Sequence, residues 1–329
     1  MISVRLRKTT YLCLKELTLT LVNILSELYY LRLTSTCFVV VILLNQYRPE
    51  MERVSVSLLF KTASNAVMEV NMKLLLHYIA IQIKSLMEYR ISFLFLTLGQ
   101  FVLSFTIFLG TYVLFQRFHV VAGYSFEEVV LCSSIILLSF SLAELAGRGF
   151  DMFQTVLGNG QFDRMLVRPR GLMFQVLASR MEFSRLGRII QALLMLGYAV
   201  SSDVVAWKLT SILILLSMVL GGTFFFFLMY VIRAALCFFT VESIEILNIF
   251  TDGGREFGGY PLIIYGKEVL LFLTVVIPFA LVQYYPFLYL TGRSQQLWYG
   301  ALPIVSMLFA IPAYAIWRAG LRYYKSTGS

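Results

Sequence analysis

Charged residues are scarce in this chain of 329 residues: they make up 14% of it, whereas a soluble domain carries roughly 25%. Hydrophobic residues make up 59%, and the mean hydropathy is +0.80. This composition excludes a soluble globular protein and predicts a membrane protein. The formal net charge of +9 then indicates basic loops beside the anionic headgroups of the cytoplasmic leaflet, and no nucleic-acid partner is expected.

The chain also has few side chains that carry chemistry. It contains two histidines, too few for a histidine metal cluster, and four cysteines without a CxxC pair, which argues against a zinc site or a disulfide framework. The cysteines are Cys13, Cys37, Cys132 and Cys237. No GxxxxGK[ST], HExxH or GxSxG pattern occurs. We therefore expect no catalytic residue, no metal and no cofactor in this chain.

What the chain does have is long runs without Asp, Glu, Lys or Arg. A helix needs about 20 apolar residues to cross the hydrocarbon core of a bilayer. Four runs reach this length, and two further segments approach it with a few charges inside. The four runs are 91–116, 209–232, 269–292 and 294–317, and the two less clean segments are 126–147 and 187–207. The pattern predicts an all-α polytopic membrane protein with six transmembrane helices.

The distribution of lysine and arginine predicts the orientation of these helices. With the residues before the first span in the cytoplasm, 16 basic residues after residue 71 face the cytoplasm and 3 face outside. Seven of the sixteen are arginines between residues 148 and 188, in the loop that joins the second and third spans. We expect both termini in the cytoplasm. Arg180, Arg185 and Arg188 are expected to anchor the start of the third span at the headgroups.

The segment 234–292 allows a second arrangement. Glu242 and Glu245 interrupt an apolar stretch, and prolines fall inside the run 269–292, where a proline kinks or breaks a helix. In this arrangement 234–257 crosses outward and 269–292 is a re-entrant or broken hairpin on the outer side. The distribution of basic residues after residue 71 then becomes 14 facing the cytoplasm and 5 facing outside. The residues leave both arrangements open. The candidate residues of a pathway or re-entrant element are Glu242, Glu245, Pro261, Pro278 and Pro286.

The part before the first span divides in two. Residues 73–90 form a basic segment with apolar residues at helical spacing, which predicts an N-terminal interfacial helix along the cytoplasmic surface. Residues 1–71 contain no uncharged run longer than 15 residues, which is short for a crossing. The pattern leaves open whether they are an N-terminal extension or lie upstream of the true start, and whether they have a fixed fold.

A short helix is predicted inside the arginine-rich loop. Residues 158–160, Gly-Asn-Gly, are typical of a turn, and a helix that starts near Phe162 must end before Pro169. Its apolar stripe would consist of Phe162, Met165 and Leu166, with Asp163 and Arg164 turned away. From the residues alone, this helix either rests on lipid or inserts into a groove of a cytosolic partner.

The second span carries a face of small residues and one carboxylate. Ser139, Ala143 and Gly147 recur every four residues, which lets a neighbouring helix approach closely. Glu144 lies about one turn from the cytoplasmic end, where it can pair with Arg148 at i+4. The alternative is a functional intramembrane carboxylate.

Four sequence elements occur together in this chain. They are FDRMLVRP at 162–169, YPLIIY at 260–265, IPFA at 277–280 with YP at 285–286, and GLRYYKSTG at 320–328. In this combination the chain from Met72 onward resembles the permease subunits of type-2 ABC exporters, in particular the small six-span permeases. The first element resembles the family's LL-x-RP motif after span two, and the last its terminal G-x-x-x-Y-x-S-x-G. The chain departs from the family at Phe238-Phe239, where relatives often have Phe-Trp. Residues 72–329 are therefore expected to form one permease domain.

The resemblance implies a mechanism and its partners. Such permeases pair as homodimers or with a sister permease, and two copies of a separate ATPase subunit bind their cytoplasmic face. ATP-driven closure of the ATPases pushes on a coupling helix between spans two and three. The residues expected to form this helix are Gly160, Phe162, Asp163, Arg164, Met165, Leu166, Arg168 and Pro169. The resemblance also favours the second arrangement of 234–292.

We therefore expect a transport subunit without enzymatic activity, in the cell membrane of a bacterium. Its cargo would be an amphipathic small molecule or a lipid-like compound, moved outward. A non-catalytic membrane scaffold or assembly factor would have the same composition, and a transport assay separates the two classes.

Overall fold

The computed structural model describes residues 72–202, 204–240 and 245–325. These residues fall into two compact units, a larger one that begins at Gln82 and a smaller one to which residues 72–81 and 166–172 belong. Residues 72–88 are helical, and Tyr89 separates them from the next helix. The described residues contain no β-strand. The hypotheses on residues 1–71 lie outside the described residues.

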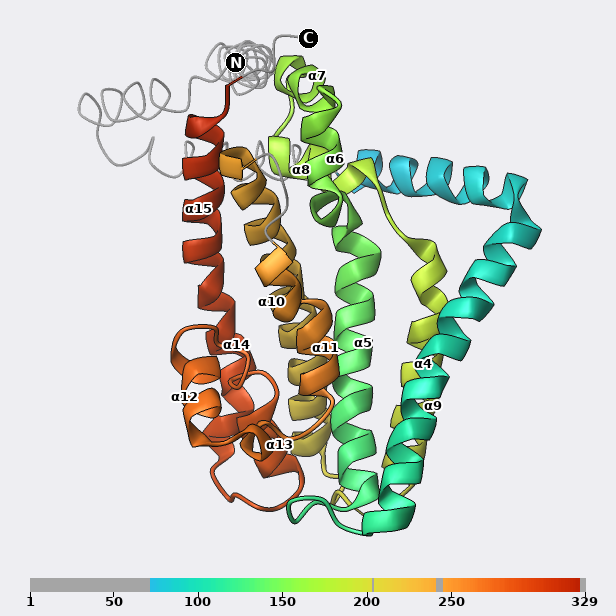
Figure 1. Cartoon of the computed structure of the whole chain (residues 1–329), viewed down its shortest axis with the longest axis vertical. Helices are drawn as coiled ribbons and strands as arrows, with labels where there is room; N and C mark the ends of the chain where they lie inside the picture. Colours follow the sequence, from blue (N-terminus) through green and yellow to red (C-terminus); the bar gives the residue numbers. More distant parts are fainter. Residues whose placement is uncertain (1–71, 203, 241–244, 326–329) are drawn as a thin grey trace, which may run out of the picture. The chain divides into compact units, whose positions relative to one another are not determined.

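The helices of the chain are labelled in Figure 1. The first group comprises α4 (Arg90–Phe118), α5 (Phe126–Asp151), α6 (Phe153–Gly158), α7 (Gln161–Val167), α8 (Leu172–Ser179), η1 (Phe183–Arg185), α9 (Leu186–Ser201) and α10 (Leu209–Thr240). The second comprises η2 (Glu245–Ile249), α11 (Asp252–Gly258), η3 (Leu262–Tyr265), α12 (Lys267–Val275) and α13 (Tyr284–Leu290). The last comprises η4 (Leu297–Ala301), α14 (Leu302–Ser306), η5 (Met307–Phe309) and α15 (Ala310–Tyr323).

Among the described residues, 4 helical segments are long and apolar enough to cross a membrane. They are Arg90–Phe118, Phe126–Gly158, Leu209–Thr240 and Leu297–Tyr323, which correspond to the expected first, second, fourth and sixth spans. The expected third span is α9, whose 16 residues rise about 24 Å and fall short of a hydrocarbon core of about 30 Å. The run 269–292 does not form one helix. The structure thus gives an all-helical membrane protein with fewer long spans than the six that the sequence predicts.

α5 is the central helix of the larger unit. It packs against α10 on one side and α9 on the other, while α4 packs on α9 and α15 packs on α10. The small-residue face of α5 meets α10 as predicted. The Ser139 hydroxyl donates to the Val219 carbonyl over 3.2 Å, and a Cβ on Gly147 would lie 3.0 Å from the Tyr230 ring.

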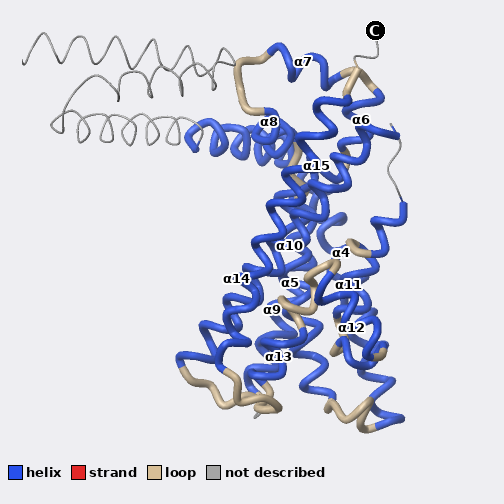
Figure 2. Tube along the Cα trace, turned by 90° about the vertical axis from the view of Figure 1, so that its left-hand side faces the viewer, coloured by secondary structure: helices blue, strands red, loops and turns tan. Residues whose placement is uncertain are grey.

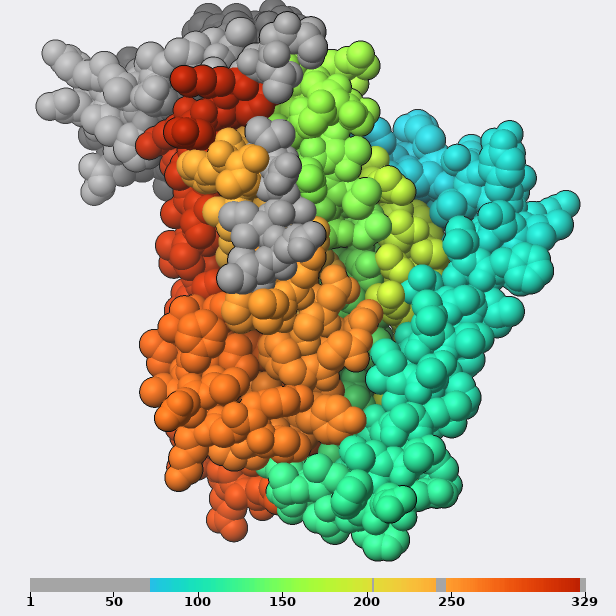
Figure 3. Space-filling model, viewed as in Figure 1, coloured from blue at the N-terminus to red at the C-terminus, as the bar shows by residue number. Residues whose placement is uncertain are grey.

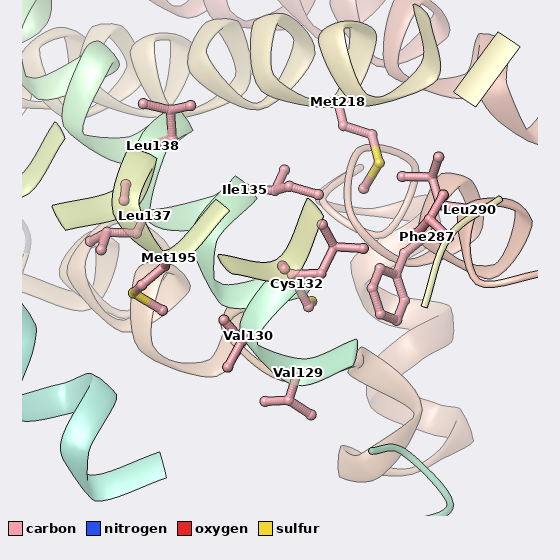
Figure 4. Packing of buried hydrophobic residues seen from close by; sticks show 14 of the residues in the cluster. Val129, Val130, Cys132, Ile135, Leu137, Leu138, Met195, Met218, Phe287 and Leu290 are labelled. Atoms are coloured by element: carbon pink, nitrogen blue, oxygen red, sulfur yellow. The ribbon is translucent and has the colours of Figure 1, made fainter. Parts of the chain in front are cut away.

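A cluster of buried apolar side chains holds these helices together. Figure 4 shows part of it: Ile135 and Leu138 come from α5, Met195 from α9, Met218 from α10, and Phe287 from α13. Each of these side chains is almost fully buried. The core therefore joins the short helix α13, far along the sequence, to the three long helices.

The chain between α10 and α14 is broken into short helices. α10 continues to Thr240, so residues 234–240 belong to it and not to a separate crossing. α11 then packs against α5, and a Cβ on Gly258 would lie 3.3 Å from Ile136. In Figure 2, α12 and α13 lie at one end of the larger unit and α6 lies at the other.

The prolines account for the break in 269–292. α12 ends at Val275, and the segment 276–283, which contains Pro278, turns back so that the Ala280 amide donates to the Leu273 carbonyl over 2.8 Å. Pro286 is the third residue of α13, where a helix tolerates proline because the amides of its first turn have no intrahelical acceptor. The prediction of one long helix over 269–292 is therefore wrong, and the broken hairpin of the second arrangement describes the local fold.

Candidate functional site

The turn and the short helix of the arginine-rich loop follow the sequence signals closely. α6 ends at Gly158, and Gly160 has a φ of 65°, which glycine adopts without strain. α7 then covers Gln161–Val167 and ends before Pro169.

Phe162 anchors α7 in an aromatic cluster. Its side chain is 0% exposed. The ring centroid of Phe162 lies 5.3 Å from that of Phe153 in α6, 5.2 Å from Phe238 in α10 and 5.0 Å from Tyr324. Trp317 of α15 packs on Phe153 and Phe238, at 5.5 and 5.3 Å. We call these five rings the aromatic anchor. Through them, α7 is joined to the ends of three other helices.

The position of Phe162 corrects one expectation. We expected Phe162, Met165 and Leu166 to form a single stripe that grips a partner. Phe162 instead points into the protein, while Leu166 is 39% exposed and Met165 is half-buried. Phe162 is buried because its ring packs against aromatic side chains of α6 and α10 and beside the end of α15.

A hydrogen bond reinforces the aromatic anchor. The Tyr324 hydroxyl donates to Asp163 Oδ1 over 2.9 Å. Burial and this bond to a carboxylate, which is available only while the hydroxyl is protonated, raise the pKa of Tyr324 to about 12. Tyr324 therefore stays neutral at physiological pH and ties the end of α15 to α7.

The outer side of the α7 region is polar and open. Arg164, Arg168 and Pro169 are exposed, and Val167 is 85% exposed. In the larger unit, the Gln175 side chain of α8 donates to the Met165 carbonyl over 3.0 Å and so links α8 to α7. α7 thus exposes the basic side chain of Arg164 and the apolar side chains of Leu166 and Val167.

A network of buried ion pairs connects α5 with α9. Glu144 is 5% exposed, and its oxygens accept from Arg185 Nη2 at 2.7 Å and Arg188 Nη1 at 2.9 Å. The expected i+4 partner, Arg148, is farther away at 3.8 Å. Arg185 and Arg188 are therefore counter-charges of Glu144, and the expectation that they anchor the chain at lipid headgroups is wrong. Arg180 is exposed, as that role would require.

The network extends to α10 through Asp151. Arg233 Nη1 of α10 lies 2.6 Å from Asp151 Oδ1, and Arg148 donates to the other oxygen of this carboxylate. Arg148 Nε also faces Glu182 Oε2 at 3.5 Å. Four arginines and three acidic side chains from α5, α9, α10 and the segment before α9 thus form one connected network of ion pairs.

The broken segment is held by a buried glutamine. Gln283, in the turn between α12 and α13, is 0% exposed. Its Nε2 lies within 2.9 Å of the Tyr260 carbonyl, 3.2 Å of the Gly258 carbonyl and 2.8 Å of Cys132 Sγ. Because α11 ends at Gly258, the carbonyls of Gly258 and Tyr260 have no amide partner within that helix, and Gln283 supplies the donor instead. Gln283 therefore fixes the hairpin to α11 and α5.

The structure describes four of the five candidate residues of the re-entrant element. Pro261 directly precedes η3, Pro278 lies in the turn after α12, and Pro286 lies in α13. Glu245 is the first residue of η2, and Glu242 lies outside the described residues. The two glutamates therefore do not form a described site.

A further ion pair joins the loop after α13 to the first turn of α5. Arg293 donates from Nε and Nη2 to both oxygens of Glu128, over 3.0 and 2.8 Å, and also to the Gly123 carbonyl over 2.6 Å. Its guanidinium lies over the Tyr124 ring at 4.1 Å. The bond to the carboxylate raises the pKa of Arg293, while burial raises that of Tyr124 to about 12. Both groups thus keep their charge states at any physiological pH.

Several of these residues were missed by sequence reasoning. Gln283 carries no charge, so it counted as neutral inside the run 269–292. Arg233 and Asp151 lie 82 positions apart and meet only because α10 packs on α5. The signal that could have found them is their place at the ends of two long apolar helices, where a lone charge needs a partner. Among the described residues, no three His, Cys, Asp or Glu side chains are grouped so that they could hold a metal ion.

Comparison with known proteins bears on the family of this chain. Residues 101–328, more than two thirds of the sequence, match the model of a family described as ABC-2 family transporter protein. No curated protein and no solved structure matches the chain. The match includes α5, the aromatic anchor, the broken segment and the C-terminal GLRYYKSTG element. The chain therefore belongs to the ABC-2 transporter family and is a membrane permease of an ABC transporter.

Proposed function

We propose that this chain forms half of the transmembrane pathway of an ABC exporter. ATP is hydrolysed by a separate ATPase subunit, two copies per transporter, and the other half of the pathway is a second permease, identical or a sister chain. The cargo is an amphipathic small molecule or a lipid-like compound. The transporter lies in the cell membrane of a bacterium, with both permease termini in the cytoplasm. Family membership and the long apolar helices support this proposal.

The burial of Phe162 is the observation that carries the proposal. A coupling helix must pass a push from the ATPase to the spans, and it can do so only if it is firmly attached to them. Truncating a packed phenylalanine costs about 3–5 kcal/mol, so the aromatic anchor resists being pulled apart. A displacement of α7 therefore carries the ends of α6, α10 and α15 with it.

The outer side of α7 supports the docking of a protein partner. Arg164 is exposed and can pair with acidic side chains, and α7 also exposes the apolar side chain of Val167 at its end. A short helix that presents such a mixture can enter a groove of a soluble subunit. The second role left open by the sequence, a helix resting on lipid, would favour the opposite exposure, with Phe162 outside.

Six membrane elements remain part of the proposal. In addition to the four long helices, α9 with the preceding η1 would serve as the third, and the segment from η2 to α13 as the fifth, in a broken form. Irregular backbone at membrane depth requires shielding by protein. The bonds from Gln283 to the carbonyls of Gly258 and Tyr260 supply such shielding.

The test is capture of the ATPase by permease variants. Arg164→Glu reverses a charge on exposed α7, and Arg180→Glu makes the same change at an exposed position outside it. Tagged permease is co-expressed with a candidate ABC ATPase subunit of the same organism, and the bound ATPase is quantified together with ATP-dependent transport in vesicles. We expect Arg164→Glu to lose most of the ATPase and of the transport, and Arg180→Glu to retain both.

Two outcomes would contradict the proposal. If Arg164→Glu and Arg180→Glu retain the same amount of ATPase, α7 is not the docking helix. If the wild-type permease captures no ATPase and vesicles show no ATP-dependent movement of any amphiphile, the chain is a membrane scaffold or assembly factor.

A further inference from the structure

A cavity of about 440 Å³ lies between α4, α5, α9 and the segment 255–265. Its volume is within the range of small-molecule sites, about 300–1,000 Å³. Ile107 and Phe108 of α4, Leu137 of α5 and Met195 of α9 contribute apolar walls. Figure 3 shows the recess between α4 and the chain around residue 255. The cavity is therefore shaped for an apolar group and opens beside a helix that the protein barely covers.

Two charged side chains, Arg255 and Glu256, line this cavity, and Arg255 lies at an unusual depth. The Arg255 guanidinium lies over the Phe140 ring, 5.2 Å from its centroid, and is 17% exposed. Phe140 lies near the middle of α5, roughly 16 to 21 Å from either end at 1.5 Å per residue. An arginine at the centre of a bilayer is costly and marks a functional site unless it only neutralises another buried charge.

The counter-charge of Arg255 is local and accessible. Its Nε donates to Glu256 Oε1 over 3.1 Å, and its Nη2 donates to the same oxygen. Glu256 is the next residue in the sequence, and its side chain is 49% exposed. Because both bonds go to a single oxygen of an exposed carboxylate, Glu256 can turn away and leave the N–H groups at the edge of the guanidinium to another anion. Arg255 can then bind a phosphate or carboxylate with two parallel bonds.

Neutral donors complete the polar side of the cavity. Thr111 of α4 and Tyr260 share a hydrogen bond of 3.3 Å between their hydroxyls, and both line the cavity. The Tyr265 hydroxyl, also in the lining, donates to the Phe257 carbonyl over 3.1 Å. The polar groups gather on the segment 255–265 and its contact with α4, while the opposite walls are apolar.

We propose that this cavity binds an anionic amphiphile, with its phosphate or carboxylate on Arg255 and its apolar part between α4, α5 and α9. Glu256 occupies the place of the anion when the cavity is empty. Binding at this site does not depend on the proposed function; only the step in which the bound amphiphile is transported rests on it. The bound amphiphile is either the cargo or an anionic lipid of the bilayer.

The test is equilibrium binding of radiolabelled dodecyl phosphate to the purified permease in neutral detergent. Arg255→Gln removes the charge and should weaken binding by about tenfold or more, because hydrogen bonds to charged groups are worth about 1.5–3 kcal/mol. Arg255→Lys should retain part of the binding, and Glu256→Gln should tighten it by removing the competing carboxylate. Dodecanol and inorganic phosphate, each lacking one half of the probe, should compete poorly.

A pair of glycines on α4 tests the apolar wall. Gly110 lines the cavity, and a Cβ added at either Gly110 or Gly99 would meet no atom within 4 Å. Gly110→Leu should fill the cavity and weaken binding, while Gly99→Leu on the same helix should leave binding unchanged. Equal binding by Arg255→Gln and wild type, or equal binding by the two leucine variants, would overturn the site. Competition by inorganic phosphate as strong as that by dodecyl phosphate would overturn the amphiphile as its occupant.

The source of the amphiphile is identified by lipid analysis of the purified protein. If wild type carries an anionic phospholipid that Arg255→Gln lacks, the occupant comes from the bilayer; if neither carries one while dodecyl phosphate binds, the occupant is cargo. The binding assay uses no ATPase and no transport, so its failure would remove the site and leave the proposed permease function to its own test.

Discussion

Glu144 holds two guanidinium groups inside the protein where α5 meets α9. Arg185 and Arg188 both lie within 3 Å of its oxygens, and the side chains of all three residues are mostly buried. Breaking a buried ion pair by removing one partner is far more costly than losing an exposed pair, because a desolvated charge is left behind. The Glu144 carboxylate is thus needed to balance the buried charges of Arg185 and Arg188.

Replacing Glu144 by glutamine should therefore destabilise the protein by about 3–5 kcal/mol, since Arg185 and Arg188 lose their counter-charge. Glu127→Gln makes the same change on the same helix, at its first turn, where it should cost only about 0.3–1 kcal/mol. Thermal unfolding of the detergent-solubilised protein measures both. Similar shifts in Tm for the two variants would mean that the network around Glu144 contributes no more than an exposed charge.

The sequence predicted part of this network and missed the rest for a physical reason. Glu144 and Arg148 are one helical turn apart, so their proximity follows from the helix alone. Arg188 lies 44 positions from Glu144 and becomes its partner only when α9 packs on α5. Side-chain pairs within one helix are readable from a single sequence, whereas pairs between helices depend on which faces meet.

Glycines set how closely the helices approach. A Cβ on Gly187, at the start of α9, would overlap the Thr97 carbonyl of α4. Gly197 lies ten positions further along the same helix, and a Cβ there would meet no atom within 4 Å. The α4–α9 contact is therefore made backbone to backbone at one point, a geometry that only glycine permits.

Gly187→Ala should force α4 and α9 apart and lower stability by about 1–3 kcal/mol, the usual cost of overpacking. Gly197→Ala should be neutral or stabilising by up to about 1 kcal/mol, because alanine is the better helix former. The two variants can be compared by thermal unfolding and by the yield of monodisperse protein. A larger loss for Gly197→Ala than for Gly187→Ala would show that α4 and α9 do not cross at Gly187.

The helices differ in how far the sequence predicted them. α4 and α10 follow directly from long uncharged runs, α5 from an apolar segment with a few charges, and α7 from a glycine turn and a proline stop. The prolines pointed to the break in 269–292 but could not show where the chain would turn. Arg255 belongs to the stretch 234–257 that only the second arrangement lets cross; in the structure it lies beside the middle of α5. Its depth depends on the packing of α11, which no local pattern encodes.

The larger unit has two sets of attachments, one at each end. At the end that carries α7, the aromatic anchor and the ion pairs of Asp151 join α5, α6, α10 and α15. At the other end, Arg293 joins the loop after α13 to Glu128 in the first turn of α5. The cavity with Arg255 lies between these two sets of contacts. A push on α7 can therefore reach the cavity through rigid helices, which is what the proposed permease requires.

The measurement that tests this account most directly is ATP hydrolysis by the partner ATPase in vesicles that contain the permease. Phe162→Leu weakens the aromatic anchor, and Phe287→Leu makes the same change at a fully buried phenylalanine in α13, far from α7. We predict that wild-type and Phe287→Leu permeases stimulate hydrolysis and that Phe162→Leu binds the ATPase but stimulates it several-fold less. Equal stimulation by Phe162→Leu and Phe287→Leu would contradict the claim that α7 couples ATP hydrolysis to the membrane helices.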